Sequence, residues 1–487
     1  MTSFTRAAGG SSDLADAAEK KDWPKVESLI QSHADAKVAQ IDGMTALHWA
    51  VYHDQTMIAQ KLIAAGANVT AANRYGITPL SLACVNGNDT LVKALLEGGA
   101  DPNTVLRGGE SVLMLAARTG KVEPAAALLK KGALVDATDH KGQTALMWAA
   151  AEGHGGMTGL LIQCGADRYR RLNSGFTAFL FAAREGRIDA ARALLKAGAD
   201  PNEAIVTKEK SGARDAADGT SALLLAIENG HFELAMILVE AGANPNDLRS
   251  GFAPLHTLTW VRKPNRGDDE AGQPPPETTG RLTSLEFARR LLAKGANVNA
   301  TVTDRAKSKA GGIGKEGATP FLLAAKTADL PLMKLLIELG ANPLQPNKDG
   351  STPLMAAAGL GTSAPDEEAG TEEECLAAVA YLLTLGADLN TVDRNGETAM
   401  HGAAYKSLPK MVQLLADKGA NIDIWNQKNK HGWTPLLIAQ GFRNGNFKPS
   451  AETIEAISKV MLAAGATPPP PPDRSGLGER KKKYDKS

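Results

Sequence analysis

Glycine recurs every 33 residues through the first part of this chain. Each glycine opens a similar phrase, which reads GMTALHWA, GITPLSLA, GESVLMLA, GQTALMWA and GFTAFLFA from Gly43, Gly76, Gly109, Gly142 and Gly175. A second phrase, beginning GAN, GAD or GAL, keeps the same period from Gly66 to Gly198. The opening phrase continues with looser spacing at Gly219, Gly251, Gly317, Gly350, Gly396 and Gly432. A fixed period of this length predicts a solenoid, in which stacked supersecondary units share one continuous core.

Each repeat unit reads as two short helices joined by turns. Residues such as Asn73 precede the opening glycine and suit a tight turn. Thr78 is then placed to cap a first helix, with Pro79 at its first position. The apolar pair Leu95–Leu96 belongs to a second helix, which the glycine of GAD ends in a left-handed conformation. One such pair cannot bury its apolar face alone, so neighbouring units must stack.

These phrases resemble those of the ankyrin-repeat family, G-x-T-P-L-H-x-A and L-L-x-x-G-A-D-x-N. The resemblance covers roughly residues 13–467 and is closest to multi-repeat arrays of bacterial type. It implies an all-α fold, an α-solenoid with β-hairpin tips wound into an ankyrin-repeat superhelix of about twelve repeats. It also implies that the tips and first helices line a concave side, with the second helices on the convex side.

The same reading divides the chain into four parts. We expect a disordered N-terminus over residues 1–12, a capping repeat over 13–42, the solenoid over 43–467 and a disordered tail over 468–487. The capping repeat has HAD at His33–Asp35 where later units have GAD. The tail joins a stiff run of prolines to the basic sequence RKKK. It is either a solvated, solubilising tail or a contact for nucleic acid or an acidic surface.

Insertions break the period in five places, at residues 203–218, 261–283, 302–316, 359–374 and 441–451. Each is either a tolerated surface loop or a binding element, because insertions in repeat proteins map to loops. Two of them belong to the seventh unit, from Trp260 to Gly317. Since these two loops can meet over the concave side, we predict that this unit determines specificity. Thr371 with Glu374, and Thr283 with Glu286, fit capping boxes, so the acidic run at 372–374 is interpreted as a helix start rather than a cation site.

Composition argues against several classes of function. The 54 basic residues balance the 54 acidic ones, which removes the usual electrostatic case for binding nucleic acid or a membrane surface. Apolar runs of 18 or more residues are absent, so we expect no membrane span. The N-terminus does not resemble a signal peptide, which favours a cytoplasmic protein. The alternative is a periplasmic or secreted protein whose upstream signal was lost through a misassigned start.

The residues that could carry chemistry have simpler interpretations. His48, His256 and His401 share one position of the repeat phrase, where the family uses histidine to bind neighbouring backbone. The three cysteines, Cys84, Cys164 and Cys375, have neither metal-motif spacing nor a basic neighbour that would activate them. The segment GGIGKE at 311–316 lacks the Ser or Thr of a phosphate-binding loop. We therefore predict no enzyme, metal, cofactor or small-molecule substrate.

Recognition residues are the remaining signal. Aromatic residues make up only 5% of the chain, yet many fall at positions that the resemblance directs into the concave groove. The predicted protein-binding residues are Tyr52, His53, Arg74, Tyr75, Phe176, Arg184, Phe252, Trp260, Tyr405, Lys406 and Trp433, with Phe442 at a further such position. Tyr, Trp and Arg are enriched at binding hot spots. Trp49, Trp148 and Phe181 are expected to be packed instead.

The sequence thus predicts a monomeric, non-enzymatic scaffold that binds another protein through its concave groove. Two alternatives stay open. One is a structural protein that self-assembles through the edges of the array, and the other is an enzyme whose site is built from the insertions.

Overall fold

The computed structural model describes residues 12–207, 218–264, 276, 278–304, 315–365, 367–443 and 448–470. Within these ranges the chain forms 25 helices and no extended strands, as expected for an all-α solenoid. The helices fall into two compact units, α1 to α12 and α13 to α25.

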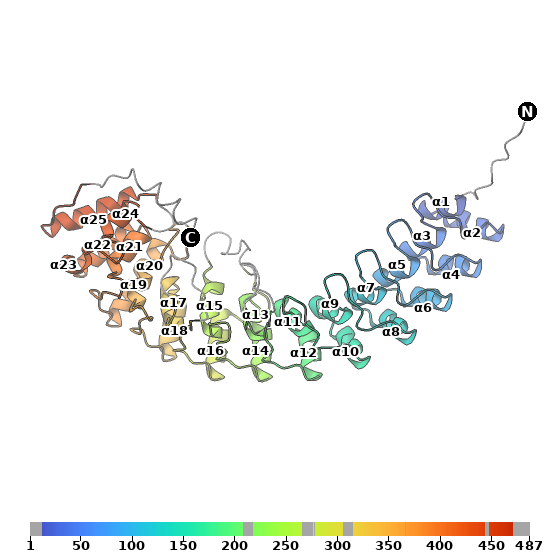
Figure 1. Ribbon diagram of the computed structural model, residues 1–487, viewed down its shortest axis with the longest axis horizontal. Helices are drawn as coiled ribbons and strands as arrows, with labels where there is room; N and C mark the ends of the chain where they lie inside the picture. Colours follow the sequence, from blue (N-terminus) through green and yellow to red (C-terminus); the bar gives the residue numbers. More distant parts are fainter. Residues whose placement is uncertain are drawn as a thin grey trace, which may run out of the picture. The chain divides into compact units, whose positions relative to one another are not determined.

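The first unit consists of six helix pairs (Figure 1). They are α1 (Asp13–Glu19) with α2 (Trp23–Gln31), α3 (Ala46–Tyr52) with α4 (Thr56–Ala64), α5 (Pro79–Asn86) with α6 (Asp89–Glu97), α7 (Val112–Thr119) with α8 (Val122–Lys130), α9 (Ala145–Glu152) with α10 (Gly155–Gln163), and α11 (Ala178–Arg184) with α12 (Ile188–Lys196). The first helices of successive pairs pack side by side in one row, and the second helices form another. The apolar core lies between these two rows.

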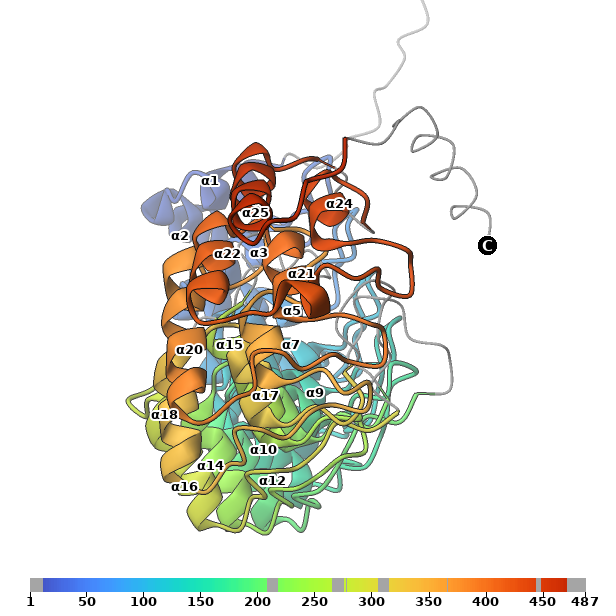
Figure 2. The same ribbon diagram turned by 90° about the vertical axis from the view of Figure 1, so that its left-hand side faces the viewer.

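The second unit repeats this plan. Its pairs are α13 (Ala222–Glu228) with α14 (Phe232–Glu240), α15 (Pro254–Arg262) with α16 (Ser284–Ala293), α17 (Pro320–Lys326) with α18 (Leu330–Glu338), α19 (Pro353–Ala357) with α20 (Glu372–Thr384), α21 (Ala399–Tyr405) with α22 (Pro409–Asp417), and α24 (Pro435–Ala439) with α25 (Ala451–Ala463). A short helix, α23 (Ile422–Trp425), precedes the last pair. In Figure 2, α16, α18, α20 and α22 lie along one side of the unit, beside α15, α17 and α21.

The helix signals read from the sequence are present in the structure. The Thr78 side chain accepts a hydrogen bond from the backbone of Ser81, and Pro79 is the first residue of α5. Thr371 and Glu374 form the complete capping box at the start of α20, so the acidic run 372–374 is the first turn of a helix. Thr283 also caps α16, but the Glu286 side chain does not accept a hydrogen bond from the backbone of Thr283 and instead pairs with Arg290.

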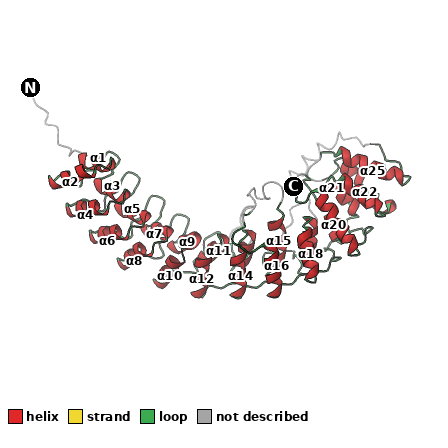
Figure 3. Ribbon diagram, turned by 180° about the vertical axis from the view of Figure 1, so that it is seen from behind, coloured by secondary structure: helices red, strands yellow, loops and turns green. Residues whose placement is uncertain are grey.

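The tips between successive pairs are turns (Figure 3, where loops are green). Two of them carry an isolated antiparallel bridge, Ala39 with Thr45 and Val105 with Ser111, where the resemblance implied β-hairpins. Adjacent tips are joined by backbone hydrogen bonds, such as that from Arg74 N to Asp42 O at 2.8 Å. The tips therefore stack from repeat to repeat as the helices do.

The insertions are described only in part. Residues 208–217, 265–275, 305–314 and 444–447 lie outside the described ranges, as do residues 1–11 and 471–487. The predicted specificity loops of the seventh unit fall mostly on these residues. At its described end, the insertion that follows α15 is held by two ion pairs, Arg262 with Asp329 and Lys263 with Glu374.

Candidate protein-binding surface

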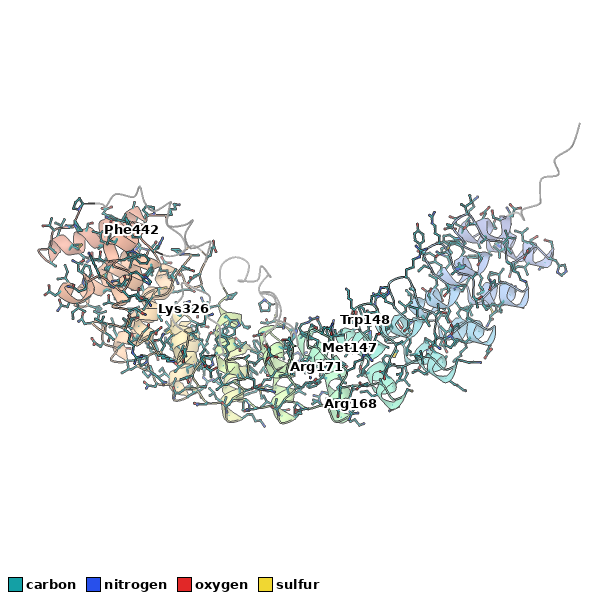
Figure 4. All side chains as sticks on the ribbon, viewed as in Figure 1. Met147, Trp148, Arg168, Arg171, Lys326 and Phe442 are labelled. Atoms are coloured by element: carbon teal, nitrogen blue, oxygen red, sulfur yellow. The ribbon has the colours of Figure 1, made fainter. Side chains whose placement is uncertain are left out.

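The tips and the outward positions of the first helices present side chains away from the core. In the first unit we call this surface the tip face. It is formed by the tips at residues 41–42, 74–75, 107–108 and 140–141 together with Trp49, Tyr52, Val85, Arg118 and Trp148. Figure 4 shows Trp148 on the side of the first helices and Arg168 at the far ends of the second helices. The tip face and the second-helix side are therefore distinct surfaces.

Aromatic side chains cluster at the start of this face. The Tyr52 ring lies 5.9 Å from Trp49 and 4.9 Å from His53, measured between centroids, and both contacts are edge-on. The indole of Trp49 donates to Gln40 Oε1 at 2.8 Å, which fixes its orientation. Tyr52 is nonetheless 55% exposed. A large aromatic held in place yet exposed loses little side-chain entropy when a partner covers it.

Arginine side chains lie over aromatic rings along the same unit. The guanidinium of Arg74 lies 4.9 Å from the Tyr75 ring, and that of Arg118 lies 5.1 Å from Trp148. Arg184 lies over both Phe176 and Phe181, at 5.0 and 5.1 Å, and pairs with Glu185. These cation–π contacts hold the arginines against the surface.

The second unit has a smaller group around the start of α15. Phe252 and Trp260 are both partly exposed, with ring centroids 5.1 Å apart. The ammonium group of Lys315 lies 5.9 Å from the Phe252 ring. Further along this unit, Trp433 stacks on His431 at 4.8 Å and is partly exposed, as is Phe442.

Three of the predicted recognition residues are buried instead. Phe176 packs against Phe181 under Arg184. The Lys406 side chain reaches inward and its ammonium group donates to the carbonyl of Ala369, in the insertion before α20. The expectation that these side chains are exposed was wrong, because Phe176 in its tip is covered by Arg184 and Lys406 at the end of α21 reaches into an inserted loop.

Tyr405 is the third buried residue. Its hydroxyl donates to Glu397 Oε1 at 2.9 Å and accepts from Asn429 Nδ2 at 3.1 Å. Burial, together with the nearby Glu397 carboxylate, raises the pKa of Tyr405 well above its usual range. Tyr405 therefore stabilises the junction with the next tip and does not face solvent.

The structure also adds residues to the tip face. Trp49 and Trp148 are partly exposed, although the sequence interpretation placed them in the core, while Phe181 is buried as expected. Val85, Arg107 and Arg118 are exposed and were not among the predicted residues. The 33-residue period was the signal that could have found them, since Val85 and Arg118 occupy the position of Tyr52, and Arg107 that of Arg74.

The histidines of the repeat phrase serve the fold. His48 Nε2 lies 3.1 Å from Ile77 O, and His256 Nε2 lies 3.0 Å from Ala300 O and 3.1 Å from Ala318 O. Burial raises the pKa of the Cys84 thiol to about 12. In the described part of the chain, no three His, Cys, Asp or Glu side chains are grouped so as to hold a metal ion. The helices described there are all too short or too polar to cross a membrane.

Comparison with known proteins agrees with this geometry. The family model for ankyrin repeats in three copies matches residues 14–106, 98–171, 113–205 and 369–448, which together exceed half of the chain. The model for a single ankyrin repeat matches residues 218–249 and 316–348.

Similar curated proteins carry the same repeats within longer chains. Neurogenic locus notch homolog protein 1 of Xenopus tropicalis is 37% identical over 172 residues, which are 35% of this chain and 6% of that protein. The B-cell lymphoma 3 protein homolog of Mus musculus is 33% identical over 163 residues, 33% of this chain and 31% of that protein. Inversin of Canis lupus familiaris is 29% identical over 163 residues, 34% of this chain and 13% of that protein. The chain thus matches less than a third of each of these relatives, and it belongs to the ankyrin-repeat family.

Proposed function

We propose that this chain is a non-enzymatic scaffold that binds another protein through the surface formed by its tips and first helices. Ankyrin repeats imply a role in protein–protein interaction. We propose that this surface lines the concave groove that the family resemblance predicts. The observation that carries the proposal is the exposure of Tyr52 at the end of α3, 55%, and of Tyr75, 54%, beside Arg74 of its own tip.

This pairing has the properties of a binding hot spot. Tyrosine offers a large, rigid and amphipathic contact, and arginine supplies planar N–H donors. In the second unit, Phe252 and Trp260 offer a similar exposed aromatic pair. An enzymatic role has less support, since His48 and His256 lie against backbone carbonyls and Cys84 and Cys375 are buried.

The chain contains an internal control for the test. Arg168 and Tyr169 form a second Arg–Tyr pair, in which the partly buried guanidinium lies 4.4 Å from a ring that is 60% exposed. This pair follows α10, in the loop at the end of a second helix. It therefore matches Arg74–Tyr75 in composition and differs in the surface on which it lies.

The experiment is affinity capture with the tagged full chain, followed by quantitative mass spectrometry. Replacing Tyr52, Tyr75 and Trp260 with alanine should remove partners that the wild-type chain retains, while Tyr169→Ala should retain them. Circular dichroism of each variant reports whether the helices persist. Equal loss of partners in both variants, with the helices intact, would contradict binding through the tip surface.

The remaining parts of the proposal have direct readouts. Light scattering of the dilute full chain should give a monomer, whereas higher species would favour self-assembly. We propose the cytoplasm as the compartment. Cell fractionation should recover the chain there, and recovery from the periplasmic or secreted fraction would overturn that assignment.

A further inference from the structure

Basic residues occupy the same position in three successive tips of the first unit. Arg74, Arg107 and His140 are spaced by the 33-residue period, and Lys141 follows directly. All four are exposed. Because each belongs to the tip of a neighbouring repeat, they form a row along the tip face.

The packing of the tips explains why these side chains lie in register. A Cβ atom added to Gly76 would lie 3.4 Å from Arg107 Cγ, and one added to Gly109 would lie 2.6 Å from His140 Cδ2. Each tip glycine thus leaves room for the basic residue of the next tip to lie directly over it. The stem of Arg107 is supported by backbone, and its guanidinium remains exposed.

Ion pairing distinguishes this row from other basic side chains of the unit. Arg74, Arg107 and Lys141 form no ion pair in the described part of the chain, whereas Lys61 and Lys93 of the second helices pair with Glu27 and Asp89. Unpaired exposed cations that recur in register raise the local positive potential.

The tips also carry carboxylates: Glu110 is partly exposed in the tip of Arg107, while Asp42 and Asp139 bind backbone amides of their own turns. Asp42 Oδ1 accepts from Met44 N at 3.0 Å. Asp139 is buried, and its Oδ1 accepts from the backbone of Lys141 at 2.9 Å and of Gln143 at 2.8 Å. Asp42 and Asp139 keep their charge, but these oxygens are held against backbone amides, whereas the side chains of Arg74, Arg107 and Lys141 are exposed.

We propose that the tip face of the first unit binds an extended, acidic segment of a partner protein, an inference that rests on the proposed function and names its partner chemistry. The row of cations calls for carboxylates, and the exposed Tyr52, Tyr75 and Val85 beside it call for apolar side chains between them. A nucleic acid would meet the same positive charge, but the apolar Val85 and the neutral balance of the whole chain favour a polypeptide.

The repeat sets the spacing of the segment. Packed helices lie about 10 Å apart, and so do successive tips. An extended chain rises about 3.3 Å per residue, so one carboxylate for each tip requires an acidic residue at about every third position. The segment would therefore alternate one acidic residue with two others, at least one of which is apolar.

The test uses synthetic peptides and the full chain. The probe is a fluorescent peptide of about fifteen residues with aspartate at every third position and leucine and serine between, and its partner is a peptide of the same composition with all aspartates consecutive. Fluorescence anisotropy should show tighter binding of the spaced peptide, weakening as salt is added. Equal binding of the two peptides would overturn the predicted spacing. Binding of neither peptide would overturn the inference that the partner segment is acidic.

Charge reversal locates the site. The combined substitutions Arg74→Glu, Arg107→Glu and Lys141→Glu should lower the affinity for the spaced peptide by about tenfold or more. A matched variant, Lys130→Glu, Lys131→Glu and Lys196→Glu, makes the same change in net charge on the second-helix side and should bind as wild type. The glutamine versions of the first set, with an unchanged circular dichroism melting curve, separate loss of charge from loss of fold.

Three further outcomes bear on the inference. Tighter binding of single-stranded oligothymidylate than of the spaced peptide would overturn it in favour of a nucleic acid. If cellular partners are still captured by the charge-reversed chain but lost on replacing Tyr52 and Tyr75, the inference of an acidic partner segment is wrong and the proposed scaffold function stands. If neither change affects capture, the tip surface itself is not the binding site.

Discussion

Arg262 Nε donates to Asp329 Oδ2 at 2.7 Å, and Arg262 Nη2 donates to Oδ1 of the same carboxylate at 3.0 Å. Asp329 is fully buried and also accepts from the backbone of Leu332 at 3.2 Å, as the N-cap of α18. This bidentate pair joins the last residue of α15 to the start of the following repeat's second helix. It therefore fixes the point at which the longest insertion leaves the array.

Breaking this pair should destabilise the second unit. Arg262→Met leaves the Asp329 carboxylate buried without its counter-charge, which should lower the unfolding free energy by about 3 kcal/mol. Urea denaturation followed by circular dichroism measures the change. Arg289→Met is the control, because the Arg289–Glu338 pair has the same bidentate geometry but is about half exposed, and exposed pairs contribute less than about 1 kcal/mol. Equal effects of the two substitutions would show that burial of Asp329 does not matter.

His256 should make the second unit sensitive to acid. Its Nδ1 accepts from Ala253 N at 3.0 Å while Nε2 faces two carbonyl oxygens, so the structure holds the neutral ring with its proton on Nε2. Burial lowers the pKa of His256 from 6.5 to about 4. Since the unfolded chain binds a proton first, the effect is absent above pH 6.5, and stability falls as the pH drops from 6.5 towards 4. The loss reaches about 3 kcal/mol for this one group.

Unfolding free energies measured from pH 7 down to pH 4 check this dependence. Replacing His256 by Gln, which retains a donor and an acceptor, should lower stability at neutral pH but flatten the decline with acid. The exposed His140 replaced by Gln should leave the decline as in wild type. A slope between pH 6.5 and 4 that is unchanged by His256→Gln would contradict the assignment.

Substitution of Tyr405 should lower stability far more than substitution of Tyr52, although both were predicted from the sequence to face a partner. Tyr405→Phe leaves Glu397 and Asn429 without their shared hydroxyl in a buried site, which should cost about 1–3 kcal/mol of stability. Tyr52→Phe removes an exposed hydroxyl and should change stability by less than about 0.5 kcal/mol. Thermal unfolding of both variants makes the comparison, and a similar melting temperature for the two would mean that the buried network contributes nothing.

Phe232 and Phe287 should couple neighbouring repeats of the second unit. They are fully buried on α14 and α16, with stacked rings whose centroids lie 5.1 Å apart. Phe287→Ala should lower the unfolding free energy by about 3–5 kcal/mol because it removes the ring and leaves a cavity. Phe287→Leu should recover part of that loss, as measured by urea denaturation. A loss below about 1 kcal/mol for alanine would show that the two pairs of helices are held together elsewhere.

The helix pairs could be predicted from the sequence because each signal is local. A cap such as Thr78, a first-turn proline such as Pro79 and a closing glycine such as Gly99 act within one or two turns, and all three lie where the period put them. The 33-residue repeat then required the units to stack. Local signals that recur in register leave few alternative folds.

The exposure of individual surface residues could not be predicted in the same way. Tyr405 and Tyr52 occupy similar positions in their repeats, but Tyr405 is covered through Glu397 and the next tip, and Lys406 reaches into an insertion. Those contacts join residues between 8 and 37 positions apart and depend on loops that interrupt the period. Exposure at a repeat position is set by the neighbouring repeat and not by the phrase itself.

Photo-crosslinking from the tip face tests the central claim most directly. A photoreactive phenylalanine derivative replaces Tyr75 in the full chain, and in a second preparation it replaces Tyr169, the exposed tyrosine of the matched Arg–Tyr pair on the second-helix side. Binding through the tips and first helices predicts a discrete covalent adduct with a partner protein from position 75 and none from position 169. Adducts from position 169 alone, or equally from both, would contradict it.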